Sequence, residues 1–589
     1  MKLQQKLAIM ADGILVGAYI HRKSKKEMKL LIDVPHEFLL ERFAHLSSPD
    51  LYTVTRHTAL WNQADMVDVC GGILSKRFEQ TGDIDEISNT VSARQRAVQL
   101  TPISHADMPG RLNNLGNSFA HRFEHAGNLA DIANAISAHQ TAVMLAPNGH
   151  ADKPSRFNNL GNSFLGRFEQ AGDLTDIANA ISAHQTAVQL TPNGHADKPS
   201  QFSNLGNSFM RRFDHTGDLA DIADAISAHQ TAVQLTPDGH ADKPSLLNNL
   251  GSSFLRRFQC TGDFSDAVAA TSNYQQSATH KFGPPSVRLQ AARRWAKLSG
   301  SHNTLNSLNA YSVAVDLLSQ IAGMDRTIQQ RHSSLVDISM LTATAASAAF
   351  AQGDVGKALE WLEQGRCLVW SQLNQLRTPV DSLQVRNKLL ADRFLDVSKA
   401  LESSGSRQEF TRLAIDGTMT QKMDLEDDAR THIMLAQDWD RLVAEIRKIP
   451  GFLNFLRPRQ ASSIMKDLPR DGLIILINVH EDRCDALALI RGCDKPLHIP
   501  LERLTYNAAS ELKDRMRKYL VFTKNIMREI DRGPREVRDP DQKGNLQEIL
   551  QELWLLVVKP ILDTLSYSVS PMWFHNIQSH SFENYSRIH

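Results

Sequence analysis

Histidine and aspartate recur together along the first half of the chain, a combination that can bind metal ions. The four pairs follow one another at intervals of 45 residues: His105 and Asp107, His150 and Asp152, His195 and Asp197, and His240 and Asp242. If each interval is one pair of helices, successive pairs lie roughly 10–20 Å apart. One ion needs ligands within about 2–2.5 Å. We therefore predict that these residues cap loops, and we expect no metal site and no cofactor.

Asparagine forms a second ladder, which is a better candidate for ligand binding. Its members occupy two positions four residues apart, Asn113, Asn158 and Asn248 at the first and Asn117, Asn162 and Asn207 at the second. Residues four apart share one helix face. Repeated amides on one face can clamp the main chain of a peptide. Structural hydrogen bonding between copies is the alternative, and the sequence leaves both open.

Two further ladders carry ionisable side chains. His139, His184 and His229 form one, which we interpret as a packed or solvated stripe, with the lining of a groove as the alternative. Arg122, Arg167, Arg212 and Arg257 form the other. We predict that these arginines pair with nearby acidic residues.

A repeat of 45 residues must position these ladders. Each copy predicts two helices, in the second copy from about Pro154 to Gln170 and from about Leu174 to Leu190, with Gly172 as a left-handed C-cap between them. The recurring structural positions are Gly116, Gly161, Gly206 and Gly251, and Pro147, Pro192 and Pro237. A mid-helix glycine costs about 1 kcal/mol relative to alanine. Its return in every copy therefore predicts close approach by a neighbouring helix in a stacked α-solenoid.

The pattern resembles the tetratricopeptide repeat. The shared positions are Leu160, Gly161, Phe164, Ala180, Ala187 and Pro192. The usual repeat has 34 residues, so the longer period here departs from the family. The resemblance implies that the first helices line a groove that holds a protein or peptide partner.

The pattern changes after Pro450. The run LIILINVH after Gly472 predicts a buried strand, and ALALI predicts a second strand that forms a hairpin with it. His480 and Cys484 lie near the turn, and we expect their proximity to be accidental rather than catalytic. Helices are predicted at about 505–531 and 545–565.

A second resemblance covers about residues 56–570. The segments LEWLEQGRCLVWSQLNQLRTP, FLRPRQASSIMKDLPRDGLIILINVHEDRCDALAL, PLHIPLERLTY and ILQELWLLVVKPILDTL are similar to fungal proteins that join tetratricopeptide repeats to a CHAT domain. The family implies a caspase-like α/β fold with a His–Cys dyad. Its catalytic motifs are not found here, and His575, His580 and His589 have no downstream cysteine.

We therefore assign no catalytic residue and expect a partial, truncated and inactive caspase-like domain on an interaction scaffold. The alternative is a cysteine protease of the CHAT type whose catalytic half is missing from this sequence. The predicted divisions are a divergent segment 1–55, the array 56–281, divergent helical repeats 282–445, and the CHAT-like region 446–589. The fold class is mainly α, an α-solenoid followed by a partial α/β domain.

Charge and cysteine content indicate which classes of partner and which cellular compartment to expect. Lys and Arg total 65 and Asp and Glu total 65, and this zero net charge argues against nucleic-acid and membrane partners. The five cysteines are widely spaced and contain no CxxC motif, which predicts a reducing, cytoplasmic location. The sequence leaves the oligomeric state open.

Overall fold

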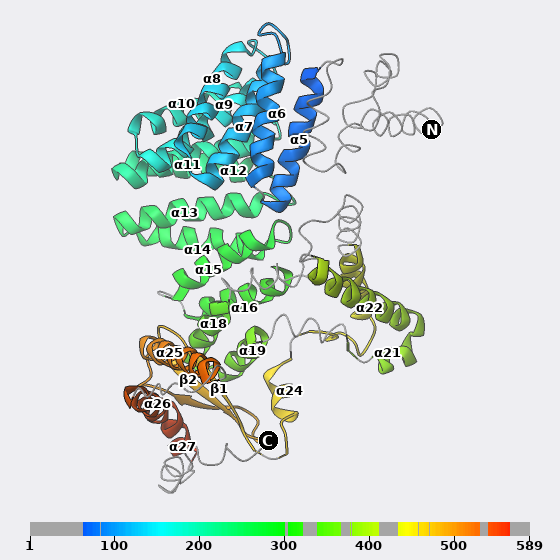
Figure 1. Ribbon diagram of the computed structural model, residues 1–589, viewed down its shortest axis with the longest axis vertical. Helices are drawn as coiled ribbons and strands as arrows, with labels where there is room; N and C mark the ends of the chain where they lie inside the picture. Colours follow the sequence, from blue (N-terminus) through cyan, green and yellow to red (C-terminus); the bar gives the residue numbers. More distant parts are fainter. Residues whose placement is uncertain are drawn as a thin grey trace. The chain divides into compact units, whose positions relative to one another are not determined.

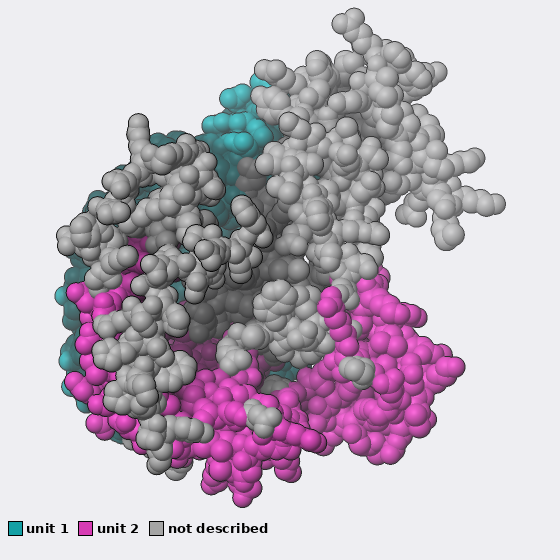
Figure 2. All heavy atoms as spheres, turned by 60° about the horizontal axis from the view of Figure 1, so that its bottom comes forward, with its two compact units in different colours: residues 1–287, 417–424 teal, residues 288–416, 425–589 magenta. Residues whose placement is uncertain are grey.

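The computed structural model describes most of the 589-residue chain. The described residues are 63–82, 84–300, 304–321, 339–366, 377–378, 380–411, 434–457, 459–470, 472–530 and 540–565. They fall into two compact units that divide after Val287 (Figure 2). The predicted N-terminal segment 1–55 and the histidines 575, 580 and 589 lie outside the described residues.

The first unit is a stack of helix pairs, drawn from blue to green in Figure 1. In order the helices are α5 (Gln63–Thr81), α6 (Ile84–Leu100), α7 (Met108–Ala126), α8 (Leu129–Leu145), α9 (Lys153–Ala171), α10 (Leu174–Leu190), α11 (Lys198–Thr216), α12 (Leu219–Leu235), α13 (Lys243–Thr261) and α14 (Phe264–Thr279). Each helix packs against its partner, and each pair packs against the next. The predicted solenoid of helix pairs is confirmed.

Local signals set the helix boundaries. The first helix of the second copy ends at Gly172, whose φ of 71° is left-handed and whose N–H donates to Phe168 O. Glycine adopts this conformation without the steric cost that a side chain adds. The second helix begins when Asp173 accepts a hydrogen bond from Thr175 N at 2.8 Å. The predicted C-cap and the predicted bounds of α10 are confirmed.

Small and aliphatic side chains fill the core between helices. Ile177, Ala180 and Ala187 in α10 are fully buried, and Leu160 and Phe164 in α9 are nearly so. Burial of each such side chain stabilises the folded state by roughly 1–3 kcal/mol. An isolated helix pair cannot bury them all, because part of its apolar surface faces the neighbouring pairs. Stacking is therefore what makes each copy stable.

The second unit combines helices with a small sheet. Its helices are α15 (Pro285–Gly300, which begins in the first unit), α16 (Thr304–Ile321), α18 (Ser339–Ala351), α19 (Val355–Arg366), α21 (Asp381–Arg386), α22 (Lys388–Thr411), α24 (Ala461–Lys466), α25 (Tyr506–Ile530), α26 (Pro540–Leu553), the π-helical turn η1 (Trp554–Val558) and α27 (Lys559–Thr564). Trp361, Leu359 and Leu487 belong to one core cluster, so α19 and the sheet share a hydrophobic core. No described helix is both long and apolar enough to cross a bilayer.

The sheet contains three antiparallel strands in the order β1-β2-β3. They are β1 (Ile474–Val479), β2 (Cys484–Leu489) and β3 (Leu497–Pro500). The predicted hairpin is confirmed, with Val479 opposite Cys484 and Ile474 opposite Leu489. The third strand was not predicted, because it follows Pro496 and ends with Pro500, and proline within a strand run argues against a central strand. The structure places β3 at the edge of the sheet, where proline is tolerated.

Candidate functional site

The repeated glycines of the array receive buried histidine rings. His139, His184 and His229 are at most 1% exposed. A Cβ placed on Gly161 would lie 2.5 Å from two atoms of the His184 ring, and Gly116 and Gly206 meet His139 and His229 in the same way. Cβ atoms do not approach other atoms this closely in folded proteins, so only glycine fits. The close neighbour at these positions is an imidazole from the second helix of the same copy.

Each of these histidines joins two copies of the repeat. His184 Nδ1 lies 2.9 Å from Ser208 Oγ in the following copy, and Nε2 lies 3.1 Å from Asn162 Oδ1 in its own copy. Burial lowers the pKa of all three histidines to about 4. The stripe is therefore packed, and its rings are neutral at pH 7.

The first and last copies fill the same cavity with different side chains. In the last copy Tyr274 lies against Gly251, and its hydroxyl donates to Ser252 Oγ at 3.2 Å. In the first described copy Arg94 lies against Gly71 and donates to Ser118 Oγ at 2.7 Å. The glycine cavity is therefore constant, whereas its polar occupant changes. Arg94 keeps the serine partner, because Ser118 is equivalent to Ser163 and Ser208, whereas Tyr274 bonds to Ser252, which replaces the asparagine of the other copies.

The predicted asparagines take part in hydrogen bonds within and between copies. Asn117, Asn162 and Asn207 bond to the three buried histidines. Asn113 Oδ1 accepts from Asn159 Nδ2 at 3.0 Å, which connects α7 to α9. Asn158 accepts from Asn204 in the same way, and Asn248 is buried. The donors Asn159 and Asn204 were not predicted, although Asn159 is the second asparagine of the Phe-Asn-Asn-Leu-Gly motif at 157–161.

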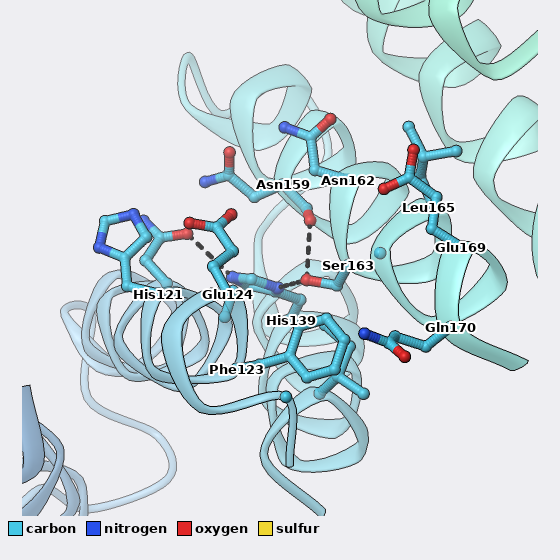
Figure 3. A pocket seen from close by; sticks show the side chains of 15 residues that line it. His121, Phe123, Glu124, His139, Asn159, Asn162, Ser163, Leu165, Glu169 and Gln170 are labelled. Atoms are coloured by element: carbon cyan, nitrogen blue, oxygen red, sulfur yellow. Dashed lines mark hydrogen bonds between the residues drawn. The ribbon is translucent and has the colours of Figure 1, made fainter. Parts of the chain in front are cut away.

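Asn117 and Asn162 also line a groove between α7 and α9. Its volume is about 620 Å³, and the other four predicted asparagines lie outside it. Figure 3 shows its side chains, with Glu124 and His121 from α7 and Asn159, Leu165, Glu169 and Gln170 from α9. Phe123 and Ile132 add an apolar part to the lining. The groove therefore combines amides, carboxylates and an aromatic ring.

The predicted arginine ladder pairs with acids, as expected. Arg167 Nε and Nη2 donate to the two oxygens of Asp176 at 2.7 and 2.6 Å, and Arg122, Arg212 and Arg257 repeat the arrangement. Asp176 is buried, and this hydrogen bond raises the pKa of Arg167. The guanidinium also lies 5.7 Å from the centre of the Phe164 ring. Each pair fastens a first helix to its second helix.

The His–Asp pairs cap loops, as predicted. His195 Nδ1 accepts from Asp197 N at 3.2 Å, and His195 N donates to Pro192 O at 3.2 Å. Pro147 and Pro237 accept the same bond from His150 and His240. These prolines therefore begin the tight turn that leads into the next first helix.

The residues His480 and Cys484 do not form a nucleophile–base pair. The Cys484 thiol is directed to the backbone oxygen of His480 at 3.7 Å, and His480 Nδ1 accepts from Asp482 N. Burial raises the pKa of the Cys484 thiol, which disfavours the reactive thiolate. The expectation that their proximity is accidental agrees with this geometry.

Comparisons with known proteins return helical repeat structures. No protein-family model matches the chain, and no curated protein matches it. The C-terminal part of a TPR repeat-containing protein from Cytophaga hutchinsonii is 13% identical, covers 50% of this chain and 93% of its own, and has a TM-score of 0.31. The human IFIT1 dimer with PPP-AAAA is 12% identical, covers 58% and 71%, and scores 0.33. The apo form of the quorum sensor NprR from B. thuringiensis is 10% identical, covers 54% and 90%, and scores 0.31.

Proposed function

We propose that the array is a protein-interaction scaffold that holds an extended segment of a partner polypeptide in the groove between α7 and α9. The observation that carries this proposal is the alignment of Asn117, Asn159 and Asn162, from successive first helices, along one open groove. An amide side chain both donates and accepts, as a peptide main chain does. Asn162 Oδ1 is held by His184, which fixes the orientation of the amide.

The composition and the C-terminal region indicate the partner class, the location and the role of the rest of the chain. We assign the partner to the protein class rather than to nucleic acid or a membrane, because the chain has no net charge. The widely spaced cysteines support a cytoplasmic location. The C-terminal region is proposed to be a CHAT-like domain that acts without catalysis. The buried thiols of Cys70 and Cys484, both with raised pKa, give no support to the peptidase alternative.

Selection from a library of random dodecapeptides displayed on phage tests the scaffold directly, with the full chain as bait. Selected peptides are then titrated calorimetrically against Asn162→Ala and, as a control, Asn179→Ala, an exposed amide on the second helix α10. We expect roughly threefold to tenfold weaker binding for Asn162→Ala, the equivalent of about one hydrogen bond, and no change for the control.

Three outcomes would overturn the proposal. One is that no peptide is selected. Another is that Asn162→Ala lowers the melting temperature but leaves peptide affinity unchanged, as a purely structural repeat protein predicts. The third is that a single-stranded RNA oligonucleotide of random sequence binds through Asn162 while peptides do not. Peptidase activity of the 589-residue chain that Cys484→Ala abolishes would instead establish the enzyme alternative.

A further inference from the structure

Ion pairs connect successive first helices along the edge of the array. Arg211 Nε in α11 lies 2.8 Å from Glu169 Oε1 in α9. Arg256 Nη2 in α13 lies 3.1 Å from Asp214 Oδ1 in α11. Each pair joins a cation to the acid at the equivalent place one copy earlier. The two pairs occupy equivalent positions in consecutive steps, from α9 to α11 and from α11 to α13, and we call this arrangement the ladder.

The ladder lacks its ion pair between α7 and α9. By the 45-residue period, Glu124 is equivalent to Glu169, and Gly166 is equivalent to Arg211. Glu124 is exposed and makes no ion pair with any residue that the structure describes. Gly166 and Glu124 both line the groove described above. The groove thus lies where the other copies place an arginine side chain.

We propose that this groove binds a basic side chain of the partner, arginine in preference to lysine, in place of the missing ion pair. The inference rests on the proposed function and specifies the partner's chemistry. Arg211 and Arg256 show that a guanidinium fits between the corresponding helices of the next two steps. Glu124 supplies the carboxylate, and a planar guanidinium can bond to both of its oxygens, which an ammonium cannot match. The buried ring of Phe123 adds apolar contact to the lining.

The charges around the groove favour a cation over an anion. Glu124 and Glu169 both line it, and the lining residues that can carry a positive charge are His121 and His139. Burial lowers the pKa of His139 to about 4, so that ring is neutral at pH 7. Gln170 and Asn162 add neutral hydrogen-bonding groups. Glu169 is already paired with Arg211. A phosphate or carboxylate ligand would therefore face the carboxylate of Glu124, whereas a guanidinium can bond to that carboxylate through its planar donors. The occupant is therefore a basic segment of polypeptide.

Peptides selected on the full chain test this preference. Each arginine in a selected peptide is replaced by citrulline, which keeps the shape and removes the charge. We expect one such replacement to weaken binding about threefold to tenfold, the equivalent of one charge-assisted contact at a partly exposed site. Glu124→Gln should remove this difference. The matched control is Asp214→Asn, which changes the equivalent acid two steps along the array, where Arg256 already occupies the position.

A second variant fills the groove without removing any of its polar side chains. A Cβ on Gly166 would lie 3.6 Å from Ile132 Cδ1 and Phe123 Cε1, which is ordinary contact, so Gly166→Arg should fold. We expect it to lose about tenfold or more in affinity for arginine-containing peptides, because its own side chain completes the ladder. Unchanged affinity in folded Gly166→Arg, or equal binding of arginine and citrulline peptides to the wild type, would overturn the inference.

A small probe separates this inference from the scaffold proposal. N-acetyl-L-arginine methylamide at millimolar concentration should raise the melting temperature of the wild type but not of Gly166→Arg, and the citrulline analogue should raise neither. If peptides bind through Asn162 but tolerate citrulline, the scaffold proposal stands and the arginine site falls. If the arginine probe binds while no peptide is selected, the arginine site stands alone. If neither the probe nor a peptide binds, both fall.

Discussion

The repeat array and the C-terminal sheet bury an aspartate with the same three-residue arrangement. In the array, Arg167 donates to both oxygens of Asp176 and lies 5.7 Å from the centre of the Phe164 ring. In the sheet, Arg483 donates to both oxygens of Asp485 at 2.7 and 2.6 Å. The same guanidinium lies 6.0 Å from the centre of the Phe350 ring. Both regions therefore satisfy a buried carboxylate with one bidentate arginine.

The two arrangements differ in how far along the chain they reach. In the array, all three residues lie within one copy, and the arrangement occurs again in the other copies. In the sheet, Phe350 comes from α18, and His498 of β3 adds a second contact to Asp485 at 2.7 Å while stacking on Phe350. Losing one such arrangement in the array should thus destabilise one copy. Losing the arrangement in the sheet should instead destabilise the packing of α18, β2 and β3 together.

The largest expected difference between the two regions is the loss of stability in acid, which should be greater for the array. The folded-state pKa of about 4 for His139, His184 and His229 lies below the unfolded value of about 6.5. The unfolded array therefore binds more protons between these values, so stability present above pH 6.5 is lost as pH falls towards 4. From pH 7 to pH 5 we expect a loss of about 2 kcal/mol for each histidine.

Two optical probes follow the two regions during urea unfolding at each pH. Far-UV circular dichroism reports on the helices of both units and so includes the array. Tryptophan fluorescence reports mainly on the second unit, because six of the seven tryptophans follow residue 288, Trp61 being the exception. The circular dichroism midpoint should fall at pH 5 by more than the fluorescence midpoint. Equal shifts in the two probes would show that the buried histidines do not set the acid sensitivity of the array.

Removing the arginine of the sheet should have the next largest effect. Arg483→Leu leaves Asp485, which is fully buried, with His498 as its remaining partner. We expect the second unit to lose about 3–5 kcal/mol, as for a broken buried ion pair. Tryptophan fluorescence in urea measures this loss. The matched variant Arg167→Leu should move the circular dichroism transition instead, and a fluorescence shift of the same size would argue against separate regions.

Exchanging the polar side chain that packs on one repeated glycine tests whether this side chain and its hydrogen-bond partner act as a pair in every copy. The last copy combines Tyr274 with Ser252, where the second copy combines His184 with Asn162. His184→Tyr and Asn162→Ser alone should each cost about 1–3 kcal/mol, because each leaves a mismatched polar pair. The double variant should cost less than the sum of the two. Strict additivity in this cycle, measured by thermal unfolding, would contradict the pairing.

Gly166→Arg should give the smallest change, and a favourable one. Replacing a helical glycine and adding an exposed ion pair with Glu124 should together stabilise the array by about 1 kcal/mol. The control, Gly161→Ala in the same helix, should destabilise it, because the new Cβ would lie 2.5 Å from the His184 ring. Thermal melts of the two variants should therefore shift in opposite directions, and two shifts of the same sign would be inconsistent with the glycine cavities.

Local patterns were predictable from the sequence, and contacts between distant residues were not. The 45-residue period predicted the helix pairs, the Gly172 cap and the arginine–aspartate pairs because each depends on residues close in the chain. The burial of His184 on Gly161 was not foreseen, because the spacing of 23 residues crosses a turn whose geometry sets the contact. A groove along the first helices was predicted, and Asn117 and Asn162 line it, but its place between α7 and α9 was not. That place depends on the side chain that Gly166 lacks, and a pattern of recurring residues does not indicate a missing one.

Photo-cross-linking tests the central claim, that the array holds a peptide between α7 and α9, most directly. A selected peptide carrying benzoylphenylalanine beside its arginine is irradiated with the full chain, and the labelled fragments are sequenced by mass spectrometry. The account predicts attachment within residues 117–124 or 159–170, on the first helices that line the groove. Attachment to the second unit, or to the exposed outer residues of α10 and α12, would contradict it.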